Sequence, residues 1–133
     1  MKAVVIGSST GGPKALEVMI DAFGEASRDF NPIHYDEFYA QQTRFGGRIV
    51  HGMLIGGFIS ACLTDHYGPG TIYLGQTLKF LAPVRPGDTV TIEFRYEASN
   101  NDPAKARKKK LQTIAIVNDT EVLTGVAEIL KPQ

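Results

Sequence analysis

The segment from His51 to Leu63 restricts the fold more than any other, because it is apolar around nearly every face of a helix. Its apolar residues are Met53, Leu54, Ile55, Phe58, Ile59, Ala61, Cys62 and Leu63. A helix that is apolar all round has to be buried on every side. From Thr71 onward, apolar and polar residues alternate with a period of two, which is typical of strands. One buried helix followed by several strands predicts an α+β fold in which an antiparallel sheet wraps around that helix.

The remaining elements follow from the same patterns. The predicted strands cover residues 2–6, about 71–80, 89–97, 110–118 and 121–130. Besides the buried helix, the predicted helices cover residues 15–26 and 36–42. The last two strands meet at Asn118-Asp119, which is a hairpin signal without the usual glycine.

The composition is that of a compact protein with balanced charge. At 133 residues the chain is predicted to form a single domain, residues 1–133, long enough to bury one core. Lysine plus arginine and aspartate plus glutamate each number 14, so charge favours neither nucleic acid nor an anionic membrane as a partner. Cys62 is the single cysteine, which excludes an internal disulfide and suits a reducing compartment. No apolar run is long enough to span a membrane, and we expect a cytoplasmic protein.

The stretch from Asp29 to His34 places a carboxylate and an imidazole five residues apart. Pro32 fixes its own φ and disfavours the α-helical region at Asn31, so a bent, ordered loop is predicted here. Such a loop can direct both side chains at one point, the arrangement that general acid–base catalysis requires. The alternative is an Asx-type turn whose histidine is simply bonded to the backbone.

Several linked motifs around this stretch occur in a fixed order. They are residues 23–40, residues 43–53 (Thr43-Arg44-Phe45-Gly46-Gly47-Arg48-Ile49-Val50-His51-Gly52-Met53), residues 68–73 (Gly68-Pro69-Gly70-Thr71-Ile72-Tyr73) and residues 78–88. In this order they resemble the MaoC-like family of hot-dog-fold enzymes, the (R)-specific enoyl-CoA hydratases. The resemblance extends from about residue 21 to the end. One residue departs from the family's pattern, because Arg28 stands where the family usually has glycine.

The resemblance implies a hot-dog fold and the reversible, stereospecific addition of water to a trans-2-enoyl-CoA, which is a hydro-lyase reaction. Asp29 and His34 match the family's catalytic pair, which holds one water between its side chains. Gly52 matches the position whose backbone N–H binds the thioester oxygen, and Ser60 matches a family serine near the catalytic aspartate. The family's reaction requires no metal and no cofactor, since coenzyme A enters as part of the acyl-CoA thioester substrate. The resemblance also implies a homodimer or a larger homo-oligomer.

The three substrate-binding candidates, Asn31, Gly52 and Ser60, also have plainer interpretations. Gly52 can be a glycine that only packing requires, and Ser60 can bond to the carbonyl group one turn back. Asn31 is expected to lock the loop more than to touch substrate. His51, directly before the buried helix, is expected to be a structural residue or a helix cap.

Two other functions stay open at this stage. A hot-dog acyl-CoA thioesterase would use a carboxylate and water to attack the thioester carbonyl, although the pairing of Asp29 with His34 favours hydration. A non-catalytic acyl-CoA-binding module is the second, and Arg28 would then mark the lost activity.

The start of the chain carries a second, shorter resemblance. Residues 4–17 are similar to the nucleophile segment of chemotaxis-receptor methylesterases, where a strand leads into a Ser-Thr-Gly-Gly turn and a helix, and Ser9 matches the catalytic serine. A serine hydrolase also needs a histidine and an acid placed against the serine. The strands that follow here could not complete that family's doubly wound sheet. We therefore expect residues 1–20 to be an atypical strand–turn–helix segment of the hot-dog domain, with Ser9 in a structural role.

Overall fold

The computed structural model describes residues 2–7, 14–96 and 106–133. The helices are α1 (Lys14–Ser27), α2 (Pro32–Tyr35), α3 (Glu37–Gln41) and α4 (Gly52–Tyr67). The strands are β1 (Lys2–Gly7), β2 (Ile72–Gln76), β3 (Lys79–Phe80), β4 (Thr89–Tyr96), β5 (Lys108–Val117) and β6 (Thr120–Leu130). These strands form one antiparallel sheet in the order β1-β4-β5-β6-β2, and β3 also pairs with β6.

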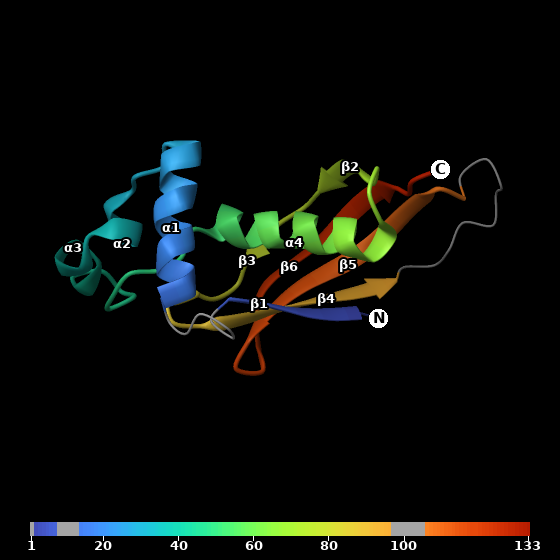
Figure 1. Ribbon diagram of the computed structural model, residues 1–133. Coiled ribbons are helices and arrows are strands. Elements are labelled where there is room, and N and C mark those ends of the chain that lie inside the picture. The colour runs from blue at the N-terminus through green and yellow to red at the C-terminus, as the bar shows by residue number, and fades with distance from the viewer. Residues whose placement is uncertain (1, 8–13, 97–105) are drawn as a thin grey trace.

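Helix α4 lies lengthwise over one face of the sheet, and α1 crosses close to its N-terminal end (Figure 1). The helix contributes Leu54, Ile55, Ile59, Cys62 and Leu63 to the core, and the sheet contributes Val90, Ile92, Phe94, Leu111, Ala115, Leu123, Ala127 and Ile129. The α+β prediction and the hot-dog arrangement are confirmed. The helix continues past its predicted end at Leu63 as far as Tyr67, where Gly68, with a φ of 101°, ends it.

The edge strands β2 and β3 bury less apolar surface than their alternating sequence suggests. Ile72 and Leu74 are about half exposed, and so is Phe80. In β4, by contrast, Val90 and Ile92 are fully buried. Among the described residues β2 and β3 pair only with β6, so their outer edge has no neighbouring strand. An edge that exposes large apolar side chains is typical of a surface that another chain covers.

The hairpin predicted at Asn118-Asp119 is confirmed. β5 and β6 pair up to Val117 and Thr120, and the two residues between them have φ values of 48° and 62°. Two consecutive positive φ values are those of a type I′ turn. Asparagine and aspartate replace glycine here because their short polar side chains tolerate the left-handed region.

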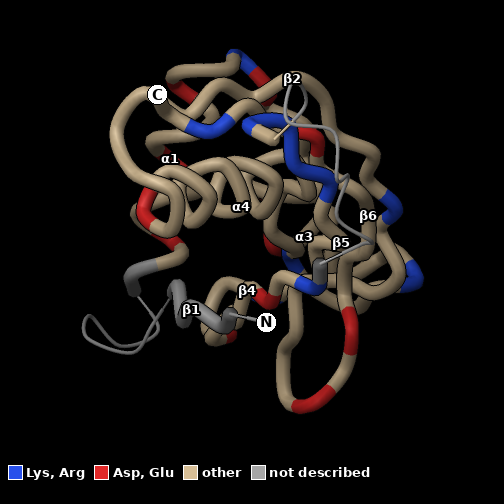
Figure 2. The backbone as a smooth tube through the Cα atoms, turned by 90° about the vertical axis from the view of Figure 1, so that its right-hand side faces the viewer, with Lys and Arg blue, Asp and Glu red and all other residues tan. Residues whose placement is uncertain are grey.

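The predicted strand and helix at the start of the chain are also confirmed. β1 pairs antiparallel with β4, from Lys2 opposite Phe94 to Gly7 opposite Thr89, and α1 follows. The turn that contains Ser9 lies outside the described residues. Acidic and basic positions are interspersed along the described backbone (Figure 2). None of the described helices has the length and apolar character needed to cross a membrane.

Candidate active site

Helix α1 ends in a residue with left-handed backbone geometry. Arg28 has a φ of 66°, and its N–H donates a hydrogen bond to the carbonyl oxygen of Gly24 over 2.7 Å. This is the hydrogen bond of an αL helix ending, a position that favours glycine because glycine has no Cβ. The guanidinium carbon of Arg28 lies 5.3 Å from the centroid of the Phe30 ring. The chain turns away from α1 here, directly before Asp29.

Replacing Arg28 by the glycine usual in the family should stabilise this ending by up to about 1 kcal/mol. A left-handed residue with a side chain costs about 1–2 kcal/mol, and the greater freedom of glycine in the unfolded chain offsets part of the gain. We expect Arg28→Gly to raise the midpoint of thermal unfolding by a few degrees. Arg28→Ala is the matched control, because it removes the guanidinium and keeps the Cβ. A glycine variant that melts below the wild type would contradict this account.

The short helix α2 carries His34 to the site. Asn31 is its N-cap and accepts a hydrogen bond from the N–H of Ile33 over 3.3 Å, and Pro32 stands in the first turn. The prediction of a loop throughout Asp29–His34 is therefore wrong beyond Asn31. Proline excludes the preceding residue from the helix, and it is also well suited to begin one. Asp29 closes a second turn by accepting from the N–H of Asn31 over 3.3 Å, so the Asx-type turns of the alternative interpretation are present as well.

The imidazole of His34 is buried and fixed by one nitrogen. Only 8% of the residue is exposed, and Nδ1 lies 2.7 Å from the carbonyl oxygen of Ile49. A carbonyl oxygen only accepts, so Nδ1 carries the proton and Nε2 of the neutral ring is the acceptor. Burial lowers the pKa of His34 below its usual value, and the neighbouring His51 acts in the same direction. The ring is thus held neutral, with an unprotonated nitrogen available for proton transfer.

His51 lies between the two predicted catalytic residues. It is 2% exposed, its Nε2 lies 3.0 Å from the carbonyl oxygen of Asp29, and its ring stacks on that of His34 at 3.9 Å between centroids. His51 was expected to be a structural residue or a helix cap: it occupies the N-cap position of α4, but its side chain makes no capping hydrogen bond and is instead buried and bonded to the backbone of Asp29. Its Nδ1 is buried without a hydrogen-bond partner in the described part of the chain.

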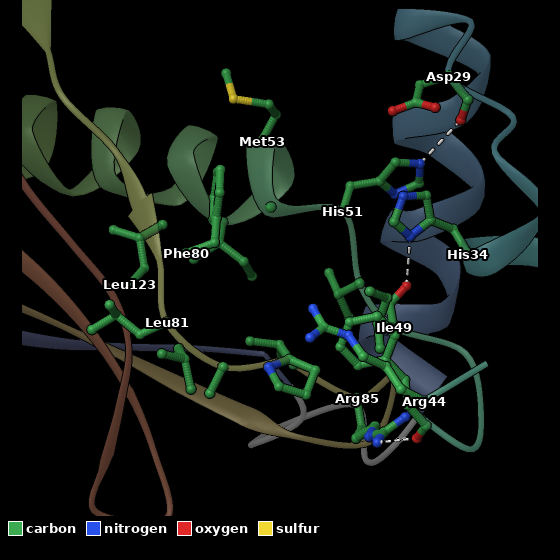
Figure 3. A pocket seen from close by; sticks show the side chains of 18 residues that line it. Asp29, His34, Arg44, Ile49, His51, Met53, Phe80, Leu81, Arg85 and Leu123 are labelled. Carbon is green, nitrogen blue, oxygen red and sulfur yellow. Dashed lines mark hydrogen bonds between the residues drawn. The ribbon is translucent and has the colours of Figure 1, made fainter. Parts of the chain in front are cut away.

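Asp29, His34 and His51 converge on one point (Figure 3). Each offers a polar atom, and these atoms all lie within 4.8 Å of one another. A water that bonds to two groups at about 2.8 Å from each fits between atoms at this separation. Within the described residues this is also the one group whose spacing would suit a divalent cation. The absence of a metal stays a prediction.

The three side chains stand at one end of a largely apolar pocket of about 640 Å³. Gly52, the first residue of α4, lines it next to His51, and its N–H has no acceptor within the helix. A Cβ at Gly52 would lie 2.4 Å from the Phe80 ring, so the glycine also serves packing. Arg44 and Arg85 line the other end (Figure 3). The remaining lining residues are Phe45, Ile49, Val50, Met53, Ile55, Phe80, Leu81, Ala82, Pro83, Val84, Val122 and Leu123.

The predicted site residues thus divide into two groups. Asp29, His34 and Gly52 line the pocket together, whereas Asn31 and Ser60 do not. Asn31 caps α2, as its plainer interpretation expected. The sequence analysis assigned His51 no place in the site. Its position directly before the apolar helix could have indicated a place in the site, because a side chain at that position contacts the residues that pack against the N-terminus of the helix.

Comparisons with known proteins identify the family of this chain. The family described as MaoC like domain matches residues 8–119. A 3-hydroxybutyryl-CoA dehydratase of Methylorubrum extorquens is 44% identical over 84% of this chain and 69% of its own length. An (R)-specific enoyl-CoA hydratase of Rhodospirillum rubrum is 61% identical over 52% of this chain, but the match spans only about half (49%) of that relative.

Among solved structures, the (R)-hydratase of A. caviae superposes with a TM-score of 0.84. The superposition covers 98% of this chain and 93% of that structure, at 34% sequence identity. The family match covers most of the chain, and the similar hot-dog structure has nearly the same length. This chain therefore belongs to the MaoC-like domain family.

Proposed function

We propose that this protein is an (R)-specific enoyl-CoA hydratase that adds water reversibly to trans-2-enoyl-CoA. One observation carries the proposal: a carboxylate, Asp29, and the unprotonated Nε2 of His34 share one end of an apolar pocket with the N-terminus of α4. The reaction needs these groups in this combination, and the names of the relatives point the same way.

Water addition begins with a water held between Asp29 and His34. As its oxygen attacks the β-carbon, one of its protons passes to the pair, and the α-carbon receives one proton from the pair. The pair therefore ends the cycle with the number of protons it started with. Because Nδ1 of His34 is bonded to Ile49, Nε2 is the nitrogen that faces this exchange. When His34 holds the transferred proton, the carbonyl oxygen of Ile49 stabilises its imidazolium through the bond to Nδ1.

The thioester oxygen gains negative charge as the β-carbon is attacked. The N–H of Gly52 stands at the positive end of the α4 dipole and is suited to receive that oxygen. The apolar walls around Met53 and Leu123 suit an acyl chain, and Arg44 and Arg85 give the far end of the pocket positive charge. No cofactor takes part, since coenzyme A belongs to the substrate.

A hydration assay on crotonyl-CoA tests the proposal directly. We expect the absorbance of the conjugated thioester to fall and the product to have the R configuration on chiral analysis. Release of free coenzyme A from crotonyl-CoA or acetyl-CoA, without hydration, would instead show a thioesterase. Binding of crotonyl-CoA without any product would show a non-catalytic binding module.

The acid limb of the pH profile should report His34. Catalysis requires its neutral ring, and burial lowers its pKa, so kcat/KM should decrease only below its usual value of about 6.5. Stability should follow the same sign: the unfolded chain binds this proton more readily, so stability is complete above about pH 6.5 and decreases below it. An acid limb at or above pH 6.5 would contradict the neutral, buried His34.

The protein should assemble as a homodimer at least. Half-exposed Ile72 and Leu74 lie on the edge strand β2, and Phe80 and Leu81 of the pocket wall are similarly exposed. A second copy would cover this surface and place the pocket beside the interface. Light scattering should give at least twice the mass of the chain, and Leu74→Lys should shift the protein toward a monomer, whereas Val18→Lys on α1 should not. An active wild-type monomer would rule the assembly out.

A further inference from the structure

His51 makes contacts with both residues of the proposed catalytic pair. Its Nε2 donates to the carbonyl oxygen of Asp29 over 3.0 Å, and its ring lies against His34 with only 29° between the planes. Phe23 and Tyr35 surround the ring, with centroids at 4.8 Å and 5.6 Å. The side chain is therefore enclosed by aromatic groups and oriented by one hydrogen bond.

The backbone of Asp29 depends on this contact. Its N–H donates to the Ser27 hydroxyl over 3.2 Å, and its carboxylate accepts from Asn31, but both partners are two residues away in the chain. These bonds shape the turn without placing it relative to the rest of the protein. The bond from His51 spans 22 residues and joins the turn to the start of α4.

His51 also directly precedes Gly52. The residue that holds the main chain of Asp29 thus also fixes where the N–H of Gly52 stands. The water-binding side of the site and the thioester-binding side are joined through one backbone position. A displacement of about 1 Å between reacting groups can lower the rate about a hundredfold. The connection that His51 makes between Asp29 and Gly52 is therefore expected to matter for catalysis.

The geometry shows which nitrogen of His51 carries the proton of its hydrogen bond. A carbonyl oxygen only accepts, so Nε2–H donates the hydrogen bond to the carbonyl oxygen of Asp29, and Nδ1 is buried without a partner among the described residues. The carboxylate of Asp29 lies within 4.8 Å of a ring nitrogen of His51, so the ring faces the side chain of Asp29 as well as its main chain.

We propose that His51 is the positioning residue of this site. It anchors the main chain of Asp29 through Nε2–H and holds the imidazole of His34 by stacking its own ring against it. The proposal rests on the hydratase function proposed above. It goes beyond that function because it assigns the placement of both groups to a residue outside the pair.

Two substitutions separate the two roles. His51→Gln keeps an N–H donor within reach of the Asp29 carbonyl oxygen but removes the ring, and His51→Phe keeps a ring against His34 but removes the donor. We expect His51→Phe to lower kcat on crotonyl-CoA by roughly ten- to hundredfold with little change in KM. His51→Gln should recover a large part of that loss. Its acid limb should move to higher pH, because His34 loses the ring that covers it.

The matched control is His66→Gln. His66 lies near the other end of α4 and does not line the pocket, so its replacement should leave kcat and the acid limb unchanged. If His51→Gln and His51→Phe had the same kcat, whether high or low, the hydrogen bond from His51 to Asp29 would have no role in catalysis, and that part of the proposal would be overturned. An acid limb that is the same in His51→Gln and the wild type would overturn the role of the ring.

Imidazole NMR of the wild type keeps the proposal testable if a variant does not fold. His51 should carry its proton on Nε2, the nitrogen that donates to the carbonyl oxygen of Asp29. A His51 that carries its proton on Nδ1, with Nε2 unprotonated, could not donate to Asp29 and would overturn the proposal. A folded wild type without hydratase activity would contradict the proposed function alone, since the NMR result decides on His51 independently.

Discussion

Asp29→Asn and His34→Ala should each leave a folded protein that hydrates crotonyl-CoA at least about a hundredfold more slowly. The amide of asparagine fits the same space and keeps the turn bond to Asn31, but it cannot accept a proton. Alanine at position 34 removes Nε2 altogether. It also leaves the carbonyl oxygen of Ile49 without its partner, so a loss of about 1–3 kcal/mol in stability is expected as well.

Steady-state kinetics and circular dichroism on the same samples check this prediction. Asp21→Asn is the matched control for the carboxylate, since Asp21 is exposed on α1 and does not line the pocket. Ser60→Ala should cost much less than either change, because Ser60 stands outside the pocket lining. Near-normal turnover in either folded variant of the pair would remove the mechanism proposed above.

Gly125→Ala should have the largest effect on stability, at about 3 kcal/mol or more. A Cβ at this position would lie 1.8 Å from the carbonyl oxygen of Thr77, which is backbone and cannot rotate away. Thr77 is fixed to β6 on both sides: its N–H donates to the carbonyl oxygen of Val126 and its hydroxyl accepts from the N–H of Val126, each over 2.9 Å. Relieving the clash would break these bonds.

Next to Thr77, residues of β2 and β5 form a buried polar network that the clash would disturb. Gln76 donates to the hydroxyl of Thr113 over 2.9 Å, and Thr113 is fully buried. The Tyr73 hydroxyl bonds to the side-chain oxygen of Gln76, and burial raises the pKa of Tyr73 to about 12. A displaced Gln76 would leave these buried groups without partners, each at a cost of about 1–3 kcal/mol.

Thermal unfolding followed by circular dichroism measures the loss, which should be roughly 10 °C for a chain of this size. Gly57→Ala is the matched control, because no atom lies within 4 Å of a Cβ there and alanine favours the helix by up to about 1 kcal/mol. Gly125→Ala unfolding at the wild-type temperature would show that the strands can separate freely at this point.

The sequence by itself was sufficient for the features that depend on neighbouring residues. The apolar run of α4 could only be a buried helix, and the alternation in β4 predicted which of its residues face the core. The hairpin at Asn118-Asp119 followed from turn chemistry alone. The linked motifs led to the family, which the comparisons confirm, and to Asp29 and His34, which the fold brings to one pocket. Their roles stay predictions.

The tertiary structure decided the features that depend on contacts through space. Gly24 looks like a weak point in a helix, yet a Cβ there would lie 1.8 Å from the Tyr35 hydroxyl, which bonds to the carbonyl oxygen of Ile20. The exposure of Ile72 follows from β2 lying at the edge of the sheet, and alternation alone does not specify that place. His51 meets Asp29 across 22 residues. Periodicity and turn signals act over a few residues of chain, whereas such contacts exist only after the helix has docked on the sheet.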